Sequence, residues 1–400
     1  MLTELRVDGY KAFRVPIAVP LRPLTILLGK NSSGKTALAR LPLTILAGAA
    51  RRPRSGQPLP LTARGLVLGS SSADLVHGRL THGSFAVGMT TVHQPDAPME
   101  LDVRLQLAQT LTRRELAFVS SFRATPLIDE IHWRPQPEAG VDTYSDMRVG
   151  AFSGLLPEYR DEAMRSLVRD LRDRLEREYA RLMHLASIRT ALEAVYEKRA
   201  LDNADDVTGA ESVHLLVSND DLLSSVGAWY QQHLRVRLAI EAEASSFGLW
   251  VTSSSTSANL ARAGQGYQQV LPVITYLCGL IEDLLPLDVL VVEEPELHLH
   301  PAVHGAVADL CVAAVSAAGR SRQVIVETHS ENLVLRVRRH VAAGALDPAL
   351  VNILWLDDSS DGATVREILI REDGSVTAWP SGVFSEDLDE VRAIAQEGHR

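Results

Sequence analysis

Cysteine is scarce in this chain: only 2 of its 400 residues are cysteine. Cys278 and Cys311 are far apart in the sequence, and each lies in an apolar stretch of helical character. A disulfide framework is therefore excluded. We expect both thiols to be buried as small hydrophobic groups in a reducing compartment.

The chain also lacks an apolar run long enough to cross a membrane. A spanning helix needs about 20 apolar residues, and the longest apolar stretches here are broken by Glu282, Asp283, His304 or Asp309. The first residues, Met1–Val7, alternate as a strand does and have no signal-peptide core. We therefore expect a cytoplasmic protein without a membrane partner.

Positive charge does not predominate. Lys and Arg number 40 against 50 Asp and Glu, so the formal net charge is −10. A protein that coats nucleic acid needs a basic surface to neutralise phosphates, so that class is excluded. DNA contact would require a local basic patch. Arg336, Arg338 and Arg339 lie on a predicted helix and are candidates, although a solvated helix face is the simpler explanation.

What the chain does contain is a glycine-rich loop that fits the pattern G-x-x-x-x-G-K-[ST] at every fixed position. Its residues are Gly29, Lys30, Asn31, Ser32, Ser33, Gly34, Lys35 and Thr36, and Ala37 opens the helix that follows. The apolar run Leu24–Leu28 precedes the loop and is typical of a buried strand. This strand–loop–helix order is the setting that a phosphate-binding loop requires.

The residue types of this loop suit a nucleotide. Gly29 and Gly34 allow the backbone to turn so that successive N–H groups point inward at an anion. Lys35 supplies positive charge for the β- and γ-phosphates, and the hydroxyl of Thr36 suits Mg²⁺. The loop therefore predicts a site for a nucleotide with its metal ion.

Two further apolar strands end in residues that complete such a site. Leu287–Val292 runs into Glu293 and Glu294, of which the first suits Mg²⁺ and the second suits polarising the attacking water. Gln323–Val326 runs into a short polar segment containing His329, which suits a hydrogen bond to the γ-phosphate or to that water. Parallel strands present their carboxyl ends at one edge, so we expect all three motifs to meet there.

A rival interpretation of the same region is a zinc site. The acids from Glu293 to Glu296 are followed by His298, His300 and His304, which are residue types that bind zinc. The spacing corresponds to no established zinc motif, and a zinc hydrolase would leave the phosphate loop unexplained. We therefore favour the nucleotide site.

Periodicity predicts how the rest of the chain is organised. Alternating segments at 85–92, 99–107, 115–122 and 128–133 predict an antiparallel β-meander. From Pro157 the pattern becomes helical, with Leu167, Leu171, Leu175, Tyr179 and Leu182 on one face, and strand character returns at 233–240 and 247–252. We expect an α/β protein with an N-terminal lobe at 1–150, an inserted helical and β subdomain at 151–260, and a C-terminal lobe at 261–400.

The order of motifs resembles that of a known family. Residues 264–273 (GQGYQQVLPV), 290–301 (LVVEEPELHLHP) and 327–332 (ETHSEN) follow the phosphate loop in turn, and 373–384 resemble the hairpin and WP-x-G-x-F ending of one subfamily. The chain thus resembles ABC-type ATPases of the SMC, RecF and OLD group. It is most similar to stand-alone bacterial AAA-family ATPases of the PtuA-like and AriA-like kind.

The resemblance implies an SMC-like P-loop NTPase head, with an antiparallel β-subdomain and an inserted helical subdomain, that uses ATP and Mg²⁺. Residues 29–36 would be Walker A with Asn31 near the γ-phosphate, Glu293 the Walker B magnesium acid, Glu294 the catalytic base and His329 the switch histidine. Lys11 matches the basic residue of the entry strand and Leu297–Pro301 the D-loop. The signature segment, of which we single out Gly264, Gln265, Gly266 and Gln268, would close over the nucleotide of a second copy.

Two departures from the family pattern affect the expected activity. Gln268 stands where close relatives have a serine, and residues 68–76 carry no Q-loop glutamine. We therefore expect slow or partner-dependent hydrolysis. The first hypothesis is an ATPase that dimerises on ATP and acts on DNA or on a separate nuclease or toxin, in DNA repair or anti-phage defence. The second is a nucleotide-sensing scaffold with little turnover. A transporter subunit is disfavoured because of the large insertion.

Overall fold

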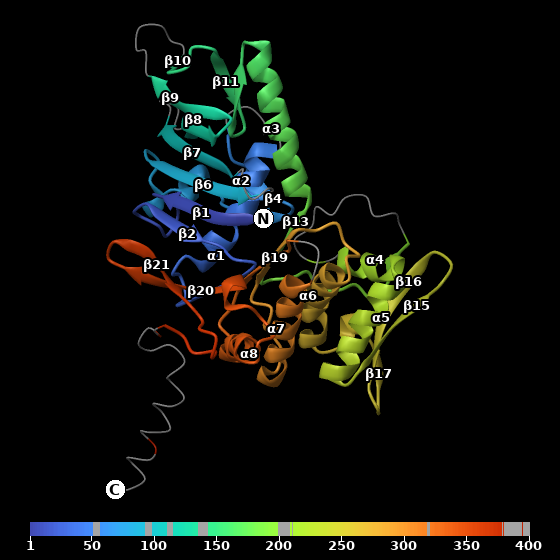
Figure 1. Cartoon of the computed structure of the whole chain (residues 1–400). Helices are drawn as coiled ribbons and strands as arrows, with labels where there is room; N and C mark the ends of the chain where they lie inside the picture. Colours follow the sequence, from blue (N-terminus) through green and yellow to red (C-terminus); the bar gives the residue numbers. More distant parts are fainter. Residues whose placement is uncertain are drawn as a thin grey trace.

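The structure is a computed structural model that describes residues 1–50, 57–92, 98–109, 115–134, 143–198, 209, 211–317, 321–377, 379 and 394. Two sheets form its centre, an antiparallel sheet in the upper part of Figure 1 and a mostly parallel sheet below it. In the part of the chain that is described, no helix is long and apolar enough to cross a membrane. Cys278 and Cys311 are buried and free, as predicted.

The lower sheet has six strands in the order β13-β18-β19-β3-β20-β21. The first five run parallel and β21 pairs antiparallel with β20. Their bounds are β13 (Leu182–Leu185), β18 (Val289–Glu293), β19 (Gln323–Glu327), β3 (Leu24–Gly29), β20 (Val351–Ser359) and β21 (Gly362–Ile368). The three strands predicted from the apolar runs before the motifs are thus neighbours in one sheet.

Both faces of this sheet are covered, which explains why its central strands are buried along their whole length and mostly apolar. Ile325 faces a core shared with α1 (Lys35–Ala39) and α2 (Leu41–Ala50). Val324 faces a second core on the opposite side. That core is built with α6 (Gln265–Ile281), α7 (Pro301–Ser316) and α8 (Glu331–Ala342).

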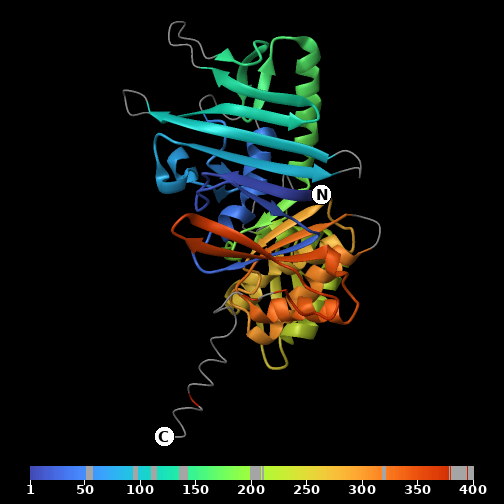
Figure 2. The same ribbon diagram turned by 60° about the vertical axis from the view of Figure 1, so that its left-hand side comes forward.

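The upper sheet is antiparallel, with the order β10-β9-β8-β7-β6-β1-β2, and it confirms the predicted meander. Figure 2 shows its long strands lying across the molecule. The strand bounds are β1 (Leu2–Asp8), β2 (Ile17–Pro20), β6 (Ser84–Val92), β7 (Pro98–Gln109), β8 (Glu115–Thr125), β9 (Ile128–Arg134) and β10 (Thr143–Tyr144). Two short antiparallel pairs and two 3-10 turns complete this part of the chain. They are β4 (Thr62–Ala63) with β5 (Leu66–Val67), β11 (Val149–Ser153) with β12 (Leu156–Tyr159), η1 (Ser72–Leu75) and η2 (His77–Arg79).

Helix α3 (Glu162–Ala180) lies beside the upper sheet and packs on α2. The prediction of helix from Pro157 was wrong, because Pro157 lies in β12 and the N-cap is Asp161, whose side chain accepts from the Ala163 N–H. Leu182 was also misplaced, because it begins β13. Leu182 continues the apolar spacing of the helix, so periodicity alone does not mark where the helix ends.

The described residues between 196 and 259 form a third region, which lies beside α6. Its helices α4 (Glu211–Ser218) and α5 (Asp220–Trp229) pack against α6. A π-helical turn, η3, occupies Tyr230–Leu234, so the strand predicted from His233 begins at Arg237 instead. The small sheet here contains β14 (Tyr196–Glu197), β15 (Arg237–Ala242), β16 (Ser246–Thr252) and β17 (Ser257–Asn259). The serine-rich segment at 253–256 forms the turn between β16 and β17.

Two 3-10 turns complete the described elements, η4 (Leu260–Arg262) before α6 and η5 (Pro348–Leu350) before β20. After β21, an isolated bridge pairs Ile370 with Val376. The predicted family-like ending at 379–384 lies outside the described residues except for Trp379.

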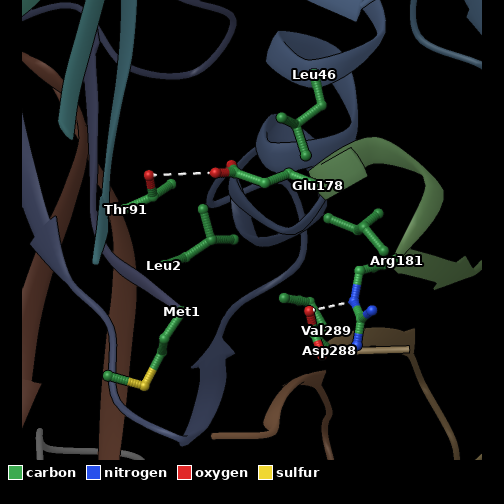
Figure 3. A pocket seen from close by; sticks show the side chains of 9 residues that line it. Met1, Leu2, Leu46, Thr91, Glu178, Arg181, Asp288 and Val289 are labelled. Carbon is green, nitrogen blue, oxygen red and sulfur yellow. Dashed lines mark hydrogen bonds and ion pairs between the residues drawn. The ribbon is translucent and has the colours of Figure 1, made fainter. Parts of the chain in front are cut away.

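A small cavity lies where the upper sheet, α3 and the lower sheet meet (Figure 3). Two polar contacts border it: Thr91 donates to Glu178 at 3.4 Å, and Arg181 pairs with Asp288 at 2.5 Å. Val289, which also lines it, is the first residue of β18. The cavity is therefore at the amino end of the parallel strands, whereas the predicted nucleotide motifs follow their carboxyl ends.

Candidate nucleotide site

The three predicted motifs lie at one edge of the parallel sheet. Strand β19 lies between β18 and β3, and Glu293 at the end of β18 is in register with Glu327 at the end of β19. Glu327 is in turn in register with Leu27, two residues before Gly29. The phosphate loop, the adjacent acids Glu293 and Glu294 and the segment that carries His329 therefore follow neighbouring strand ends, as the sequence predicted.

The phosphate loop needs glycine at both of its fixed glycine positions. Gly29 has φ 153°, and a Cβ there would lie 2.1 Å from the carbonyl oxygen of Leu356. Gly34 has φ 95° and is the N-cap of α1. Ser32 also adopts a left-handed conformation, with φ 65°. A larger residue at position 29 would push the loop away from β20, since backbone atoms do not give way as flexible side chains do.

The charged group of the loop is held by the loop itself. The Lys35 ammonium donates to the carbonyl oxygens of Gly29 at 2.9 Å and Lys30 at 2.7 Å. Burial lowers the pKa of Lys35, against the opposing effect of the Glu327 and Glu294 carboxylates. Lys30, Asn31 and Ser32 are exposed, whereas the buried hydroxyl of Ser33 has no hydrogen-bond partner.

Glu293, predicted as the magnesium ligand, has both carboxylate oxygens engaged by protein donors. Arg40 donates to them at 2.6 and 2.7 Å, His184 lies at 2.8 Å and the Ser187 N–H donates at 3.2 Å. Burial alone would raise the pKa of Glu293, but the hydrogen bonds from Arg40 and His184 outweigh it and lower the pKa to about 2. The side chain is 1% exposed, so this is a closed and buried ion pair.

Glu327 is the carboxylate that contacts the phosphate loop. The Thr36 hydroxyl donates to its Oε1 at 2.7 Å, while Oε2 is buried without a partner. Burial, together with the charges of Glu293 and Glu294, raises the pKa of Glu327 to about 7, although Thr36 and Lys35 act in the opposite direction. Sequence analysis named this segment only for its histidine. Both faces of β19 are buried, so alternation gives no signal of where the carboxylate points.

The raised pKa of Glu327 predicts a pH-dependent stability. Between its ordinary value of 4.5 and about 7, the folded protein retains a proton that the unfolded chain releases. Rising pH should therefore lower the free energy of unfolding of the nucleotide-free protein by on the order of 1–3 kcal/mol across this window. Glu327→Gln should lack this loss. Melting temperatures of wild type and variant at about pH 5 and about pH 7.5 test it; parallel pH profiles for the two proteins would contradict it.

The Walker B turn and the switch segment are joined by hydrogen bonds. Glu296 accepts from the Thr328 hydroxyl at 2.6 Å and from the His329 N–H at 2.8 Å. His304 lies 2.8 Å from the Ser330 hydroxyl. Glu296 and His304 therefore have a positioning role, because their hydrogen bonds fix the backbone that carries His329.

Glu294 and His329, the two predicted catalytic side chains, extend from backbone that these hydrogen bonds hold in place. Glu294 is half-buried, has a left-handed backbone with φ 43°, and donates its N–H to the Glu327 carbonyl at 2.7 Å. His329 is exposed, and partial burial together with Lys35 lowers its pKa. The imidazole therefore favours its neutral form, which can both donate and accept a hydrogen bond.

The residues of the rival zinc interpretation have other partners. Glu293 binds Arg40 and His184, Glu296 binds the switch segment, and His304 binds Ser330. Among the described residues, no group of three or more His, Cys, Asp or Glu side chains is arranged to hold a metal ion.

The signature segment begins α6. Gly264 is the N-cap without a side-chain cap, and both Gly264 and Gln265 are exposed. A Cβ on Gly266 would lie 2.6 Å from the His298 carbonyl oxygen, so this glycine packs against the segment that follows β18. Gln268 donates to the carbonyls of Ala261 at 3.3 Å and Ala263 at 2.9 Å. Its amide is thus used within the chain.

Arg189, which sequence analysis missed, connects the signature helix to Walker B. It is 4% exposed and donates to the carbonyl oxygens of Glu293 at 2.8 Å and Gln269 at 3.2 Å. Gln269 donates in return to the Arg189 carbonyl at 3.4 Å. Burial lowers the pKa of Arg189 to about 10. A single arginine beyond a four-residue strand forms no recognisable motif, so nothing in the sequence indicated it.

Lys11 and two of the three arginines considered for DNA contact have partners within the chain, whereas Arg339 is exposed. The Lys11 ammonium donates to the Leu68 carbonyl at 2.6 Å, which ties it to the segment where a Q-loop glutamine was sought. Arg336 pairs with Asp309 at 2.6 Å, and Arg338 donates to the Gly374 carbonyl at 2.8 Å. Because Arg336 and Arg338 bind other residues of this chain, the contacts favour an ordinary helix surface over a DNA-binding patch.

Comparison with known proteins agrees with this architecture. Residues 166–334 match the family model described as the AAA ATPase domain. No curated protein matches the chain. An SMC head bound to the C-winged helix domain of ScpA has a TM-score of 0.55 at 11% identity, over 92% of this chain and 98% of that one.

Two other solved structures have TM-scores below 0.5. They are the SMC head domain from Thermotoga maritima (0.46, 11% identity, 91% and 98% covered) and an SMC head from Pyrococcus furiosus with an extended coiled coil, bound to the C-terminal domain of ScpA (0.49, 12% identity, 100% of both chains). The fold is supported by the ScpA-bound SMC head, whose TM-score is 0.55. The chain has the mixed α/β fold of SMC head domains.

Proposed function

We propose that this protein binds and hydrolyses ATP with Mg²⁺, and that two copies enclose the nucleotide in a head-to-tail dimer. The observation that carries the proposal is the convergence of the phosphate loop, Glu294 and the switch segment at one sheet edge. The family match and the SMC-head fold support an ATPase.

Each group has a chemical role in such a site. The loop N–H groups and Lys35 would hold the phosphates, Glu294 would accept a proton from the attacking water, and His329 would orient that water or the γ-phosphate. The site also fits a magnesium ion, because the Thr36 hydroxyl and the buried carboxylate beside it offer the oxygen ligands this ion prefers, and Glu327 Oε2 is unpartnered. When bound, Mg²⁺ would neutralise charge on the β- and γ-phosphates.

The signature end of α6 would complete the site of the partner copy. The helix has 17 residues, and its exposed first turn bears the positive end of the helix dipole. A γ-phosphate placed there would gain backbone hydrogen bonds without any special side chain. Binding through the backbone is compatible with the intramolecular use of the Gln268 amide.

Gln265→Glu is expected to block this assembly while sparing the fold. An acid in the first turn of a helix stabilises the monomer slightly, by about 0.3–1 kcal/mol. Facing a γ-phosphate, the same charge should weaken ATP-driven dimerisation by roughly tenfold or more. Light scattering with and without ATP and Mg²⁺ gives the masses, and Gln265→Ala, which adds no charge, is the control. Wild-type protein that keeps monomer mass in every condition would overturn the dimer.

The ATP cycle would act on a partner. One SMC head in the comparison binds the winged-helix domain of ScpA, which sets a precedent for a protein partner on this fold. The family resemblance favours a separate nuclease or toxin, or DNA, in anti-phage defence or DNA repair. The second candidate is a nucleotide sensor with little turnover, which the intramolecular hydrogen bonds of Gln268 favour.

A further inference from the structure

We infer that Glu327, rather than the Walker B acid Glu293, is the carboxylate that contacts the magnesium ion beside Thr36. The inference rests on the proposed function, because it concerns the metal that accompanies ATP. It moves the metal contact from β18 to β19, the strand adjacent to the phosphate-loop strand. Three observations carry it.

First, Glu293 has no oxygen free for a metal ion. Its Oε1 is bonded by Arg40 Nε at 2.6 Å and faces His184 Nε2 at 2.8 Å. Its Oε2 accepts from Arg40 Nη2 at 2.7 Å and from the Ser187 N–H at 3.2 Å. The carboxylate is fully buried with these donors, so turning it toward a metal would break several charge-assisted hydrogen bonds at once.

Second, releasing Glu293 would leave its partners unpaired. His184 is 0% exposed, and the guanidinium of Arg40 spans both oxygens of the acid. Releasing the acid would leave the buried His184 ring nitrogen without this contact and Arg40, whose side chain is 21% exposed, without its carboxylate, and both losses are costly. Glu293 is therefore best understood as the anchor that fixes the end of β18 and, through it, the position of Glu294.

Third, Glu327 already occupies the position beside the metal-binding threonine. Its Oε1 accepts from the Thr36 hydroxyl at 2.7 Å, and its Oε2 is buried with no hydrogen-bond partner. A buried carboxylate oxygen without a partner calls for an explanation, and a bound ion beside Thr36 supplies one. Mg²⁺ binds through one or two protein oxygens, water and substrate phosphates, so one threonine and one carboxylate are a sufficient protein contribution.

The test compares metal-dependent nucleotide binding in Glu327→Gln and Glu293→Gln. Glutamine at 327 keeps an acceptor for Thr36 but loses the charge. Binding of the non-hydrolysable analogue AMPPNP is measured with Mn²⁺ and with EDTA, and bound Mn²⁺ is followed by electron paramagnetic resonance. We expect Glu327→Gln to lower Mn²⁺ affinity in the nucleotide complex by roughly 10–100-fold. Nucleotide binding in EDTA should be unchanged, and Glu293→Gln should retain the Mn²⁺ signal.

A paired variant removes the ambiguity of a folding defect. Arg40→Gln combined with Glu293→Gln deletes the acid without leaving the arginine unpaired, so its Mn²⁺ affinity can be compared directly with that of wild type. Mn²⁺ binding retained by Glu327→Gln, or lost in this double variant, would overturn the inference while leaving the ATPase proposal standing. Wild-type protein that binds no AMPPNP with or without metal would overturn the ATPase proposal, and this inference with it.

Discussion

Replacing Glu294 with glutamine is expected to lower kcat for ATP hydrolysis by roughly 10²–10⁴-fold while ATP still drives dimerisation. Glutamine has the same shape but accepts no proton from the attacking water. The backbone N–H of residue 294 would still bond to the Glu327 carbonyl, so the turn should keep its geometry. Steady-state phosphate release and the mass in the presence of ATP and Mg²⁺ measure both effects.

The control for this variant is Glu282→Gln, an exposed acid just beyond the far end of α6. It makes the same chemical change away from the site and should turn over like wild type. Equal turnover by Glu294→Gln and wild type would contradict the role of Glu294. If neither wild type nor Glu294→Gln hydrolysed ATP while ATP still drove dimerisation, the ATPase cycle would be refuted in favour of the nucleotide sensor.

Replacing Glu293 with alanine is expected to destabilise the protein by about 3–5 kcal/mol, the range for removing one partner of a buried ion pair. Arg40 would lose both of its bonds to the acid, and His184 would lose its contact inside the sheet. The shift of the urea unfolding midpoint, followed by tryptophan fluorescence and circular dichroism together, measures the loss.

The neighbouring acid is the control for this change. Glu294→Ala removes the same carboxylate from a half-buried position and should cost about 1 kcal/mol or less. Similar losses for the two variants would show that the Arg40–Glu293 pair contributes little. The comparison separates the stabilising effect of Glu293 from that of the adjacent acid.

Elements whose signals are local can be predicted from the sequence. Leu24–Leu28, Leu287–Val292 and Gln323–Val326 are continuous apolar runs that end in reactive residues, and they are neighbouring strands in the structure. The meander was equally visible, because its strands alternate over many residues. In each case the pattern lies within one segment, so no knowledge of the pairing was needed.

The contacts that define the site depend on which strands pair, so they could not be predicted from the sequence. His184 and Arg189 act through the end of β18, yet they lie in or after a four-residue strand whose first residue, Leu182, continues a helical pattern. Glu327 faces Thr36 only because β19 lies beside β3. Long-range register decides these contacts, and one sequence contains no measure of it.

Arg189 reaches the backbone carbonyls of Glu293 and Gln269 rather than their side chains. Those acceptors exist whatever amino acids occupy the two positions. The two hydrogen bonds that Arg189 donates are therefore insensitive to substitution at positions 293 and 269 and depend on the identity of residue 189, whereas the return bond at 3.4 Å depends on the Gln269 side chain. A substitution at position 269 would thus leave the helix bonded to the end of β18. Tolerance of sequence change is a property that this one buried side chain confers on the site.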